Sequence, residues 1–151
     1  MLSVTRETPD QTEVLHLLRL ADERSSSLYP AERRHGPNVA TLVTQGVRFF
    51  VARLEGVAVG CGGYIPCGNG VGELKRMFVD SKMRGQGIGR ALLQNIEDEA
   101  SREGIRVLQL ETGVKSLEAR GLYRQLGYRE RGPFGGYNPD PLSVFMEKEL
   151  G

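Results

Sequence analysis

The chain has 151 residues, with 20 Lys and Arg against 19 Asp and Glu, so its formal net charge is +1. This balance does not favour a highly charged partner such as duplex nucleic acid or an anionic membrane surface. No segment approaches the ~18 consecutive apolar residues of a membrane span, and residues 1–10 lack the apolar run of a signal peptide. We therefore expect one domain over residues 1–151, located in the cytoplasm.

Cysteine and histidine are rare in the chain, which limits the thiol and metal chemistry that it can support. Cys61 and Cys67 fall in one expected strand and the loop after it, and no export signal precedes them, so we expect reduced thiols rather than a disulfide. The only histidines, His16 and His35, lie in the N-terminal region, far in sequence from both thiols. We find no metal-ligand spacing and no cysteine nucleophile.

The N-terminal third shows one strand and two helices. Residues 2–5 alternate apolar and polar side chains as a short strand does. The segment 8–11, Thr-Pro-Asp-Gln, has the pattern of a capping box around a proline and predicts that a helix begins there. The helical pattern fades at the serines 25–27, a loop or arm is expected over 30–38, and 39–43 predicts a short helix that ends near Gly46.

The rest of the chain alternates strands and helices. Three strands expected over 47–54, 57–65 and 73–79, separated by turns at 55–56 and 66–70, form an antiparallel meander. Further on we expect a helix from Gly89 to Gly104, a strand at 105–110, a helix at 116–126 and two strands at 128–131 and 142–149. This order predicts an α/β (α+β) fold with one mixed, mostly antiparallel sheet of six or seven strands and helices on both faces.

A glycine-rich loop, Arg84-Gly85-Gln86-Gly87-Ile88-Gly89, follows the third strand of the meander and opens a helix. Alternating glycines let the backbone approach a ligand, and a helix start with an added cation attracts a phosphate. The spacing is not a dinucleotide fingerprint, because Arg90 stands where the third glycine is required, and no Gly-Lys-Ser/Thr of a P-loop follows. By themselves the glycines fit a tight turn without a ligand equally well.

Two longer motifs resemble the GNAT superfamily of acetyltransferases. Residues 73–79 followed by Arg84-x-x-Gly87-x-Gly89 are similar to the central motif of that family. Residues 119–128, in which alanine precedes Leu-Tyr and Gly-Tyr opens the next strand, resemble its downstream helix. The resemblance spans about 47–150, whereas the first ~45 residues match only in layout, as is usual where acceptors differ. It implies the GNAT fold, with acetyl-CoA as the donor and coenzyme A as a product.

The resemblance also implies which residues hold the cofactor. In the family, the main chain of the central strand bonds the pantetheine arm, and the glycine loop holds the pyrophosphate. The implied cofactor-binding set is Met77, Phe78, Val79, Arg84, Gly85, Gln86, Gly87, Ile88, Gly89, Arg90 and Ser116. Ser116 departs from the pattern, because many members have an asparagine there, and serine shortens the reach of the side chain.

Aminolysis of a thioester needs a neutral amine and a proton for the departing thiolate. The resemblance makes Glu73 the first candidate base, acting directly or through water, with Glu111 in reserve and a solvated strand-end carboxylate as the alternative for Glu73. Tyr123 matches the family tyrosine near the cofactor sulfur and is expected to protonate the thiolate, although a phenol of pKa ~10 also serves simply as a packed helix residue.

The loop 132–141 between the last two strands is long and aromatic. Phe134 and Tyr137 are expected either to wall a small-molecule pocket or to cover the core. We expect transfer of an acetyl group to a primary amine, preferably of a small molecule, by direct attack in a ternary complex. The alternatives are a peptide or protein N-acetyltransferase and a non-catalytic acyl-CoA sensor. The role of residues 22–46 and self-association into a homodimer stay open.

Overall fold

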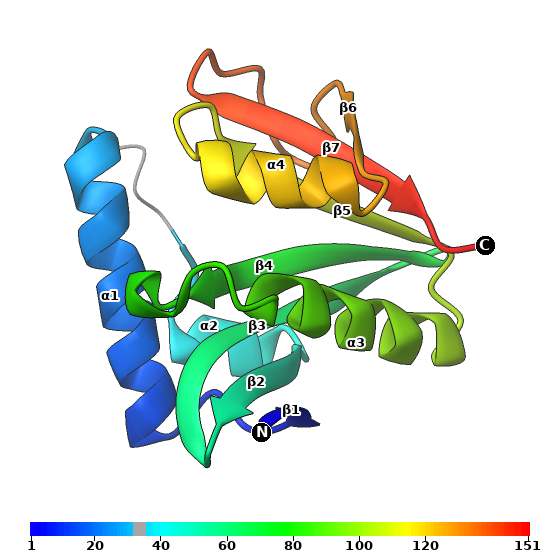
Figure 1. The fold of residues 1–151 in the computed structure, drawn as a ribbon. Helices are drawn as coiled ribbons and strands as arrows, with labels where there is room; N and C mark the ends of the chain where they lie inside the picture. The colour runs from blue at the N-terminus through cyan, green and yellow to red at the C-terminus, as the bar shows by residue number, and fades with distance from the viewer. Residues whose placement is uncertain (32–35) are drawn as a thin grey trace.

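The computed structural model describes residues 1–31 and 36–151, so His35 and the middle of the loop expected over 30–38 lie outside the described residues. Its sheet has seven strands in the order β1-β2-β3-β4-β5-β7-β6 (Figure 1). The elements are β1 (Leu2–Arg6), α1 (Thr12–Leu28), α2 (Val39–Thr44), β2 (Arg48–Leu54), β3 (Val57–Gly68), β4 (Val71–Val79), η2 (Ser81–Met83), α3 (Ile88–Arg102), β5 (Val107–Gly113), α4 (Leu117–Gln125), β6 (Arg129–Arg131) and β7 (Ser143–Glu149).

Neighbouring strands in the sheet are antiparallel except for β4 and β5, which run parallel. Helices α1 and α2 pack on one face around Leu17, Leu42 and Phe49, and α3 packs on the other face around Leu92 and Ile96. Both core clusters draw on alternate strand residues, as a sheet covered on both faces requires. The fold class expected from the sequence is confirmed, and no described helix is long and apolar enough to cross a membrane.

Two element boundaries differ from the expectation. Helix α1 begins at Thr12 rather than at Pro9, because the Gln11 side chain donates to the Thr8 carbonyl (2.9 Å) and to Glu7 instead of returning to the Thr8 N–H. The helix then continues through the three serines to Leu28. Strand β3 extends through Pro66, whose missing N–H costs nothing because β2 ends opposite Tyr64 and leaves that edge unpaired.

Strand β4 carries a bulge at Arg76, where φ is +56°. The register with β3 changes there, since Cys61 pairs with Phe78 but Gly63 pairs with Lys75. A Cβ at Gly62 would collide with the Met77 sulfur, so a larger residue opposite the bulge would force the Met77 side chain to move. Bulges re-aim side chains and end strand pairing, and this one directs the Arg76 side chain toward α1.

The turn before α1 is fastened to β2 by one arginine. The guanidinium of Arg53 donates to both carboxylate oxygens of Glu7, at 2.7 and 2.9 Å, and to Glu13 at 2.9 Å. The hydrogen bonds from Arg53 lower the pKa of Glu7 from its ordinary value of 4.5 to about 2. A carboxylate with a depressed pKa stabilises the fold above its unfolded pKa and loses that contribution as the pH falls.

We expect Glu7→Gln to lower the free energy of unfolding at pH 7 by about 1–3 kcal/mol, with the difference from wild type shrinking as pH falls from about 5 to 2. Urea titrations at several pH values measure it. Glu99→Gln, which removes a carboxylate paired with Arg102 on the outer surface of α3, is the matched control and should change little. A difference between Glu7→Gln and wild type that stays constant with pH would contradict the assignment.

Candidate active site

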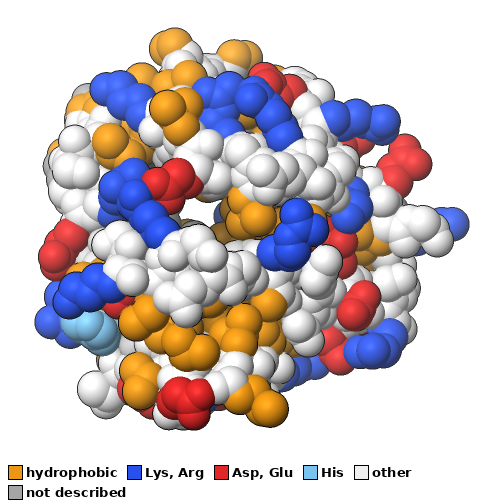
Figure 2. Space-filling model, in the orientation of Figure 1, with side chains coloured by type: hydrophobic (Ala, Val, Ile, Leu, Met, Phe, Trp, Pro, Cys, Tyr) orange, Lys and Arg blue, Asp and Glu red, His pale blue; other side chains and the backbone are white. Residues whose placement is uncertain are grey.

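Strands β4 and β5 pair over three positions and then separate. The pairs are Val71 with Val107, Gly72 with Leu108 and Glu73 with Gln109. Beyond them a pocket of about 910 Å³ lies between the strands, lined also by α1, the loop before α3 and the start of α4. Figure 2 shows the molecule hollowed on this face, with basic and acidic side chains beside the opening. The main-chain groups that β4 turns toward β5 past Glu73 have no strand partner there.

The start of α3 faces this pocket without a side-chain cap. Its N-cap is Gly87, with φ of +75°, and the first helical bond runs from the Ala91 N–H to the Gly87 carbonyl (3.0 Å). The amides of Ile88, Gly89 and Arg90 precede that bond and have no helical acceptor. Gly85 also has a positive φ of +77°, and a methyl group at Gly85 or Gly87 would meet no atom within 4 Å. The loop is therefore open to an anion.

Gly89, the third glycine of the loop, is small for a packing reason rather than to leave room for a ligand. A Cβ at Gly89 would lie 2.8 Å from the Leu122 side chain, so Gly89 lets α3 approach α4 closely. Arg84 points to α4 as well, where it pairs with Glu118 at 2.6 Å. Both side chains are largely exposed, and such surface pairs are worth ~0–1 kcal/mol. Arg84 is thus free to exchange Glu118 for an anionic ligand.

Most of the implied cofactor-binding residues line the pocket. The members of that set that line it are Met77, Phe78, Val79, Arg84, Gly85, Gly87, Ile88, Gly89, Arg90 and Ser116. Gln86 is not among the lining residues, and its side-chain amide lies 3.6 Å from the Met83 sulfur, so its part in cofactor binding stays a prediction. The side chain of Ile88 is buried in the core, so this residue offers the pocket main-chain atoms.

Ser116 is engaged by a residue that sequence reasoning missed. The hydroxyl of Tyr29, just after α1, lies 3.0 Å from the Ser116 hydroxyl and accepts a hydrogen bond from the Lys115 N–H (3.0 Å). A side chain at Gly113 would collide with Tyr29. The phenol thus links the end of α1 to the residues that open α4. No local pattern around Tyr29 predicts this contact, because its partners are more than 80 residues away.

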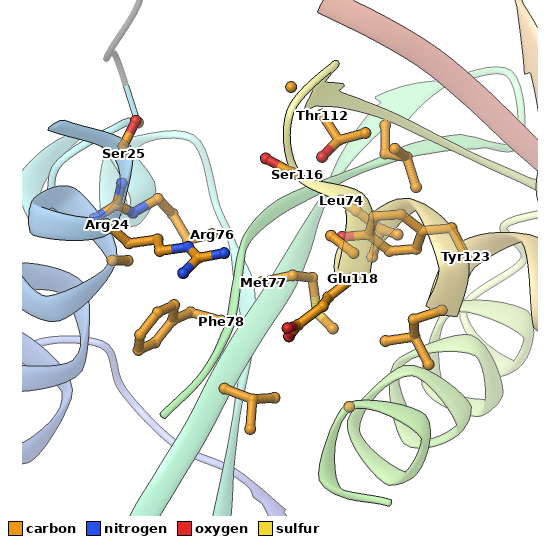
Figure 3. A pocket seen from close by; sticks show the side chains of 18 of the residues that line it. Arg24, Ser25, Leu74, Arg76, Met77, Phe78, Thr112, Ser116, Glu118 and Tyr123 are labelled. Carbon is orange, nitrogen blue, oxygen red and sulfur yellow. The ribbon is translucent and has the colours of Figure 1, made fainter. Parts of the chain in front are cut away.

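Tyr123 of α4 is buried beside the pocket. Figure 3 shows its ring extending from α4 toward Leu74 and Met77 of β4. It stacks edge-on with Tyr128 at 5.6 Å, and its hydroxyl has no hydrogen-bond partner among the described residues. Burial raises the pKa of Tyr123 well above its ordinary value, so the hydroxyl stays protonated at neutral pH. The hydroxyl is thus a neutral O–H group beside the pocket.

Glu73 belongs to a three-membered network. The Tyr137 hydroxyl donates to the Glu73 carboxylate (2.6 Å), and the Lys75 ammonium lies 2.9 Å from the same oxygen and donates to Tyr137 (3.0 Å). Burial acts to lower the pKa of Lys75, but its hydrogen bonds to Tyr137 and Glu73 outweigh this and raise it. The side chain of Glu73 is 15% exposed, so the alternative of a solvated strand-end carboxylate is wrong.

The two aromatic residues of the loop 132–141 have separate places. Tyr137 lines the pocket, as expected. Phe134 does not: its ring is buried and packs against Tyr137 at 5.2 Å and Phe145 at 5.6 Å. Of the two expectations for Phe134, the pocket wall is therefore corrected and the cover for the core agrees with the structure, because β7 supplies Phe145 as an apolar partner for its ring. Phe134 instead packs edge-on against the ring of Tyr137 and helps to hold that ring in place.

The reserve base also faces the pocket. Glu111 of β5 accepts a hydrogen bond from the Ser143 hydroxyl (2.6 Å) and lines the cavity together with Glu73.

Both cysteines are free thiols, and burial raises the pKa of Cys61 to about 12, so it is no thiolate at neutral pH. Within 1–31 and 36–151, no cluster of three His, Cys, Asp or Glu side chains is arranged to hold a metal ion.

Residues 12–128 match a family model described as the acetyltransferase (GNAT) family. The chain belongs to this family. It is 49% identical over 150 residues to the IAA acetyltransferase of Azospirillum brasilense, covering 99% of this chain and 98% of that one. A Klebsiella pneumoniae structure described as an acyl-CoA N-acyltransferase superposes with a TM-score of 0.89 at 36% identity, over 100% and 99% of the chains.

The PaiA N-acetyltransferase of Thermoplasma acidophilum, solved in complex with coenzyme A, shares the fold with a TM-score of 0.78 at 16% identity, over 99% of each chain. The protein described here is thus an acetyl-CoA-dependent N-acetyltransferase, as the two sequence motifs predicted. Its residues fit this cofactor, because the uncapped start of α3 and the open space at Gly85 and Gly87 suit an anion beside a pocket of about 910 Å³.

We expect Gly87→Asp to weaken acetyl-CoA binding roughly tenfold or more, since it places a side chain and a negative charge at the open N–H groups of α3. Isothermal titration calorimetry measures the affinity. Gly121→Asp in α4 is the matched control, because a Cβ there meets no atom within 4 Å and the residue does not line the pocket. Equal affinities of the two folded variants would count against an anion site at this loop.

Proposed function

We propose that the protein acetylates the primary amine of a small molecule by direct attack within a ternary complex. The observation that carries the proposal is a single pocket that adjoins both the open N–H groups of α3 and the carboxylates Glu73 and Glu111. A donor and an acceptor therefore have room in one cavity, as direct transfer requires. The 49% identical relative is named for a small-molecule acceptor, which supports this class.

On the donor side, acetyl-CoA supplies an activated acyl group as a thioester. The main chain of Met77, Phe78 and Val79 would hold it beside the separated edge of β4, with the Phe78 or Val79 N–H available to polarise an acyl oxygen. Arg84 and the amides that open α3 would neutralise the pyrophosphate charge. None of these roles depends on a particular side chain from Met77 to Val79, which agrees with their packing in the two cores.

On the acceptor side, an alkylammonium with a pKa of ~10.4 is almost wholly protonated at neutral pH and cannot attack a carbonyl. Glu73 would take that proton directly or through water, held in one orientation by Lys75 and Tyr137. Glu111 on the neighbouring strand is the reserve. Tyr123 would return a proton to the departing thiolate, which its buried and protonated hydroxyl suits.

The direct test is a panel of small primary amines incubated with enzyme and acetyl-CoA, with products identified by mass spectrometry. An acetylated small amine, formed in proportion to enzyme, is the expected result. Release of coenzyme A without an acetylated product shows only thioester hydrolysis. Acetylation of peptide amines with none of the small ones would overturn the proposed acceptor class.

Tyr123→Phe is expected to lower kcat by roughly 10²–10⁴ while leaving acetyl-CoA affinity unchanged, because only the hydroxyl is lost. Steady-state kinetics with a true acceptor measure the effect. Tyr128→Phe is the matched control, since Tyr128 is also a buried tyrosine but its hydroxyl binds Glu97 (2.8 Å) outside the pocket. Wild-type turnover in Tyr123→Phe would reduce this residue to a packing role.

Glu73→Gln is expected to lower kcat/KM most near neutral pH and to recover toward wild type as the pH approaches the pKa of the amine, where free base forms without help. Full pH profiles of kcat/KM distinguish this from a positional effect, which would scale the whole profile evenly. Glu111→Gln is measured in parallel. A pH-dependent loss in Glu111→Gln, with Glu73→Gln unaltered, would exchange the roles of the two carboxylates.

A further inference from the structure

Arg24 lines the pocket from the last turns of α1. Its side chain forms no hydrogen bond or ion pair with any residue of the described ranges, 1–31 and 36–151. Figure 3 shows Arg24 lying between α1 and β4, on the side of the pocket where Phe78 points. The pocket thus contains a guanidinium to which the rest of the described chain offers no counter-charge.

The neighbouring cations are already neutralised. Arg76 donates to Asp22 (2.9 Å) and to the Leu18 carbonyl (3.2 Å), and the bulge at Arg76 fixes it in that direction. Lys75 pairs with Glu73 at 2.9 Å. Within residues 1–31 and 36–151, these two pairs leave Arg24 as a cation on the α1 side that a ligand can match without breaking a contact.

Arg24 is exposed at the pocket lining, so an amine that extends to the α1 side would take part of its charge out of water, which is unfavourable unless the ligand supplies a partner. A guanidinium presents a planar fork of donors that matches an oxyanion such as a carboxylate or phosphonate. The amine end of the same ligand is attracted to Glu73 and Glu111, which face the pocket from β4 and β5. Recognition at two ends of opposite charge orients the acceptor.

The position of Arg24 separates it from the cofactor phosphates. Helix α1 packs on the face of the sheet that carries Leu42 and Phe49, whereas α3, whose start forms the anion site, packs on the opposite face. An anion at Arg24 therefore belongs to the acceptor. We propose that the acceptor is an amine that also carries an oxyanion, and that Arg24 binds this oxyanion. The proposal rests on the acetyl transfer proposed above.

The test compares kcat/KM for paired acceptors that differ only in the anion: phenylalanine against phenethylamine, γ-aminobutyrate against propylamine, and aminoethylphosphonate against ethylamine. For an oxyanion-bearing amine that the wild type prefers, Arg24→Gln should lower kcat/KM roughly ten- to hundredfold, mainly through KM, and leave the value for the partner without the oxyanion unchanged. Arg24→Lys should retain part of the preference. Carboxylate and phosphonate pairs show which oxyanion is favoured.

Arg19→Gln is the matched control, because Arg19 is exposed on α1 but does not line the pocket. Calorimetry with acetyl-CoA accompanies the kinetics. An equal loss for both members of each pair, or a weakened acetyl-CoA affinity in Arg24→Gln, would overturn the inference. Acetylation only of the amines that lack an oxyanion would overturn it and leave the proposed function standing, whereas no acetylated product from either class would refute both.

Discussion

The separation of β4 from β5 after three residue pairs is the constraint on which the site depends. Parallel strands normally continue side by side, because each added residue satisfies further main-chain groups. Here β4 turns away from β5. The cavity between the strands is lined by the start of α3, the C-terminal half of α1 and the β5–α4 connection. The sheet thereby gives up hydrogen bonds that an extended ligand is able to replace.

The bulge at Arg76 serves the sheet and the site together. A non-glycine residue with positive φ is uncommon, and such conformations cluster at functional sites. It redirects β4 while keeping it paired with β3, and Gly62 provides the space that Met77 then needs. It also sends the Arg76 guanidinium to Asp22 of α1, which ties that helix to the strand beneath the pocket.

The pocket has two electrostatically different ends. Near α3 the positive groups are main-chain amides and the exposed Arg84, whose pairing with Glu118 is weak enough to exchange. On the α1 side most charged side chains form ion pairs: Glu73 binds Lys75 and Tyr137, and Arg76 binds Asp22. A donor rich in phosphate suits the first end, and an amine suits the second. In the proposed ternary complex, the cavity would therefore distinguish its two substrates by charge.

The order of elements, the fold class and the glycine loop were predictable from the sequence, because hydrophobic period, turn residues and helix starts are local properties. The contacts of Tyr29 with Ser116, of Tyr137 with Glu73 and of Arg76 with α1 became visible only in the folded chain, because they join residues more than 50 positions apart. The folded chain also shows that Phe134 supports the pocket instead of lining it. Such contacts depend on how packed elements meet in space, which no spacing along the chain records.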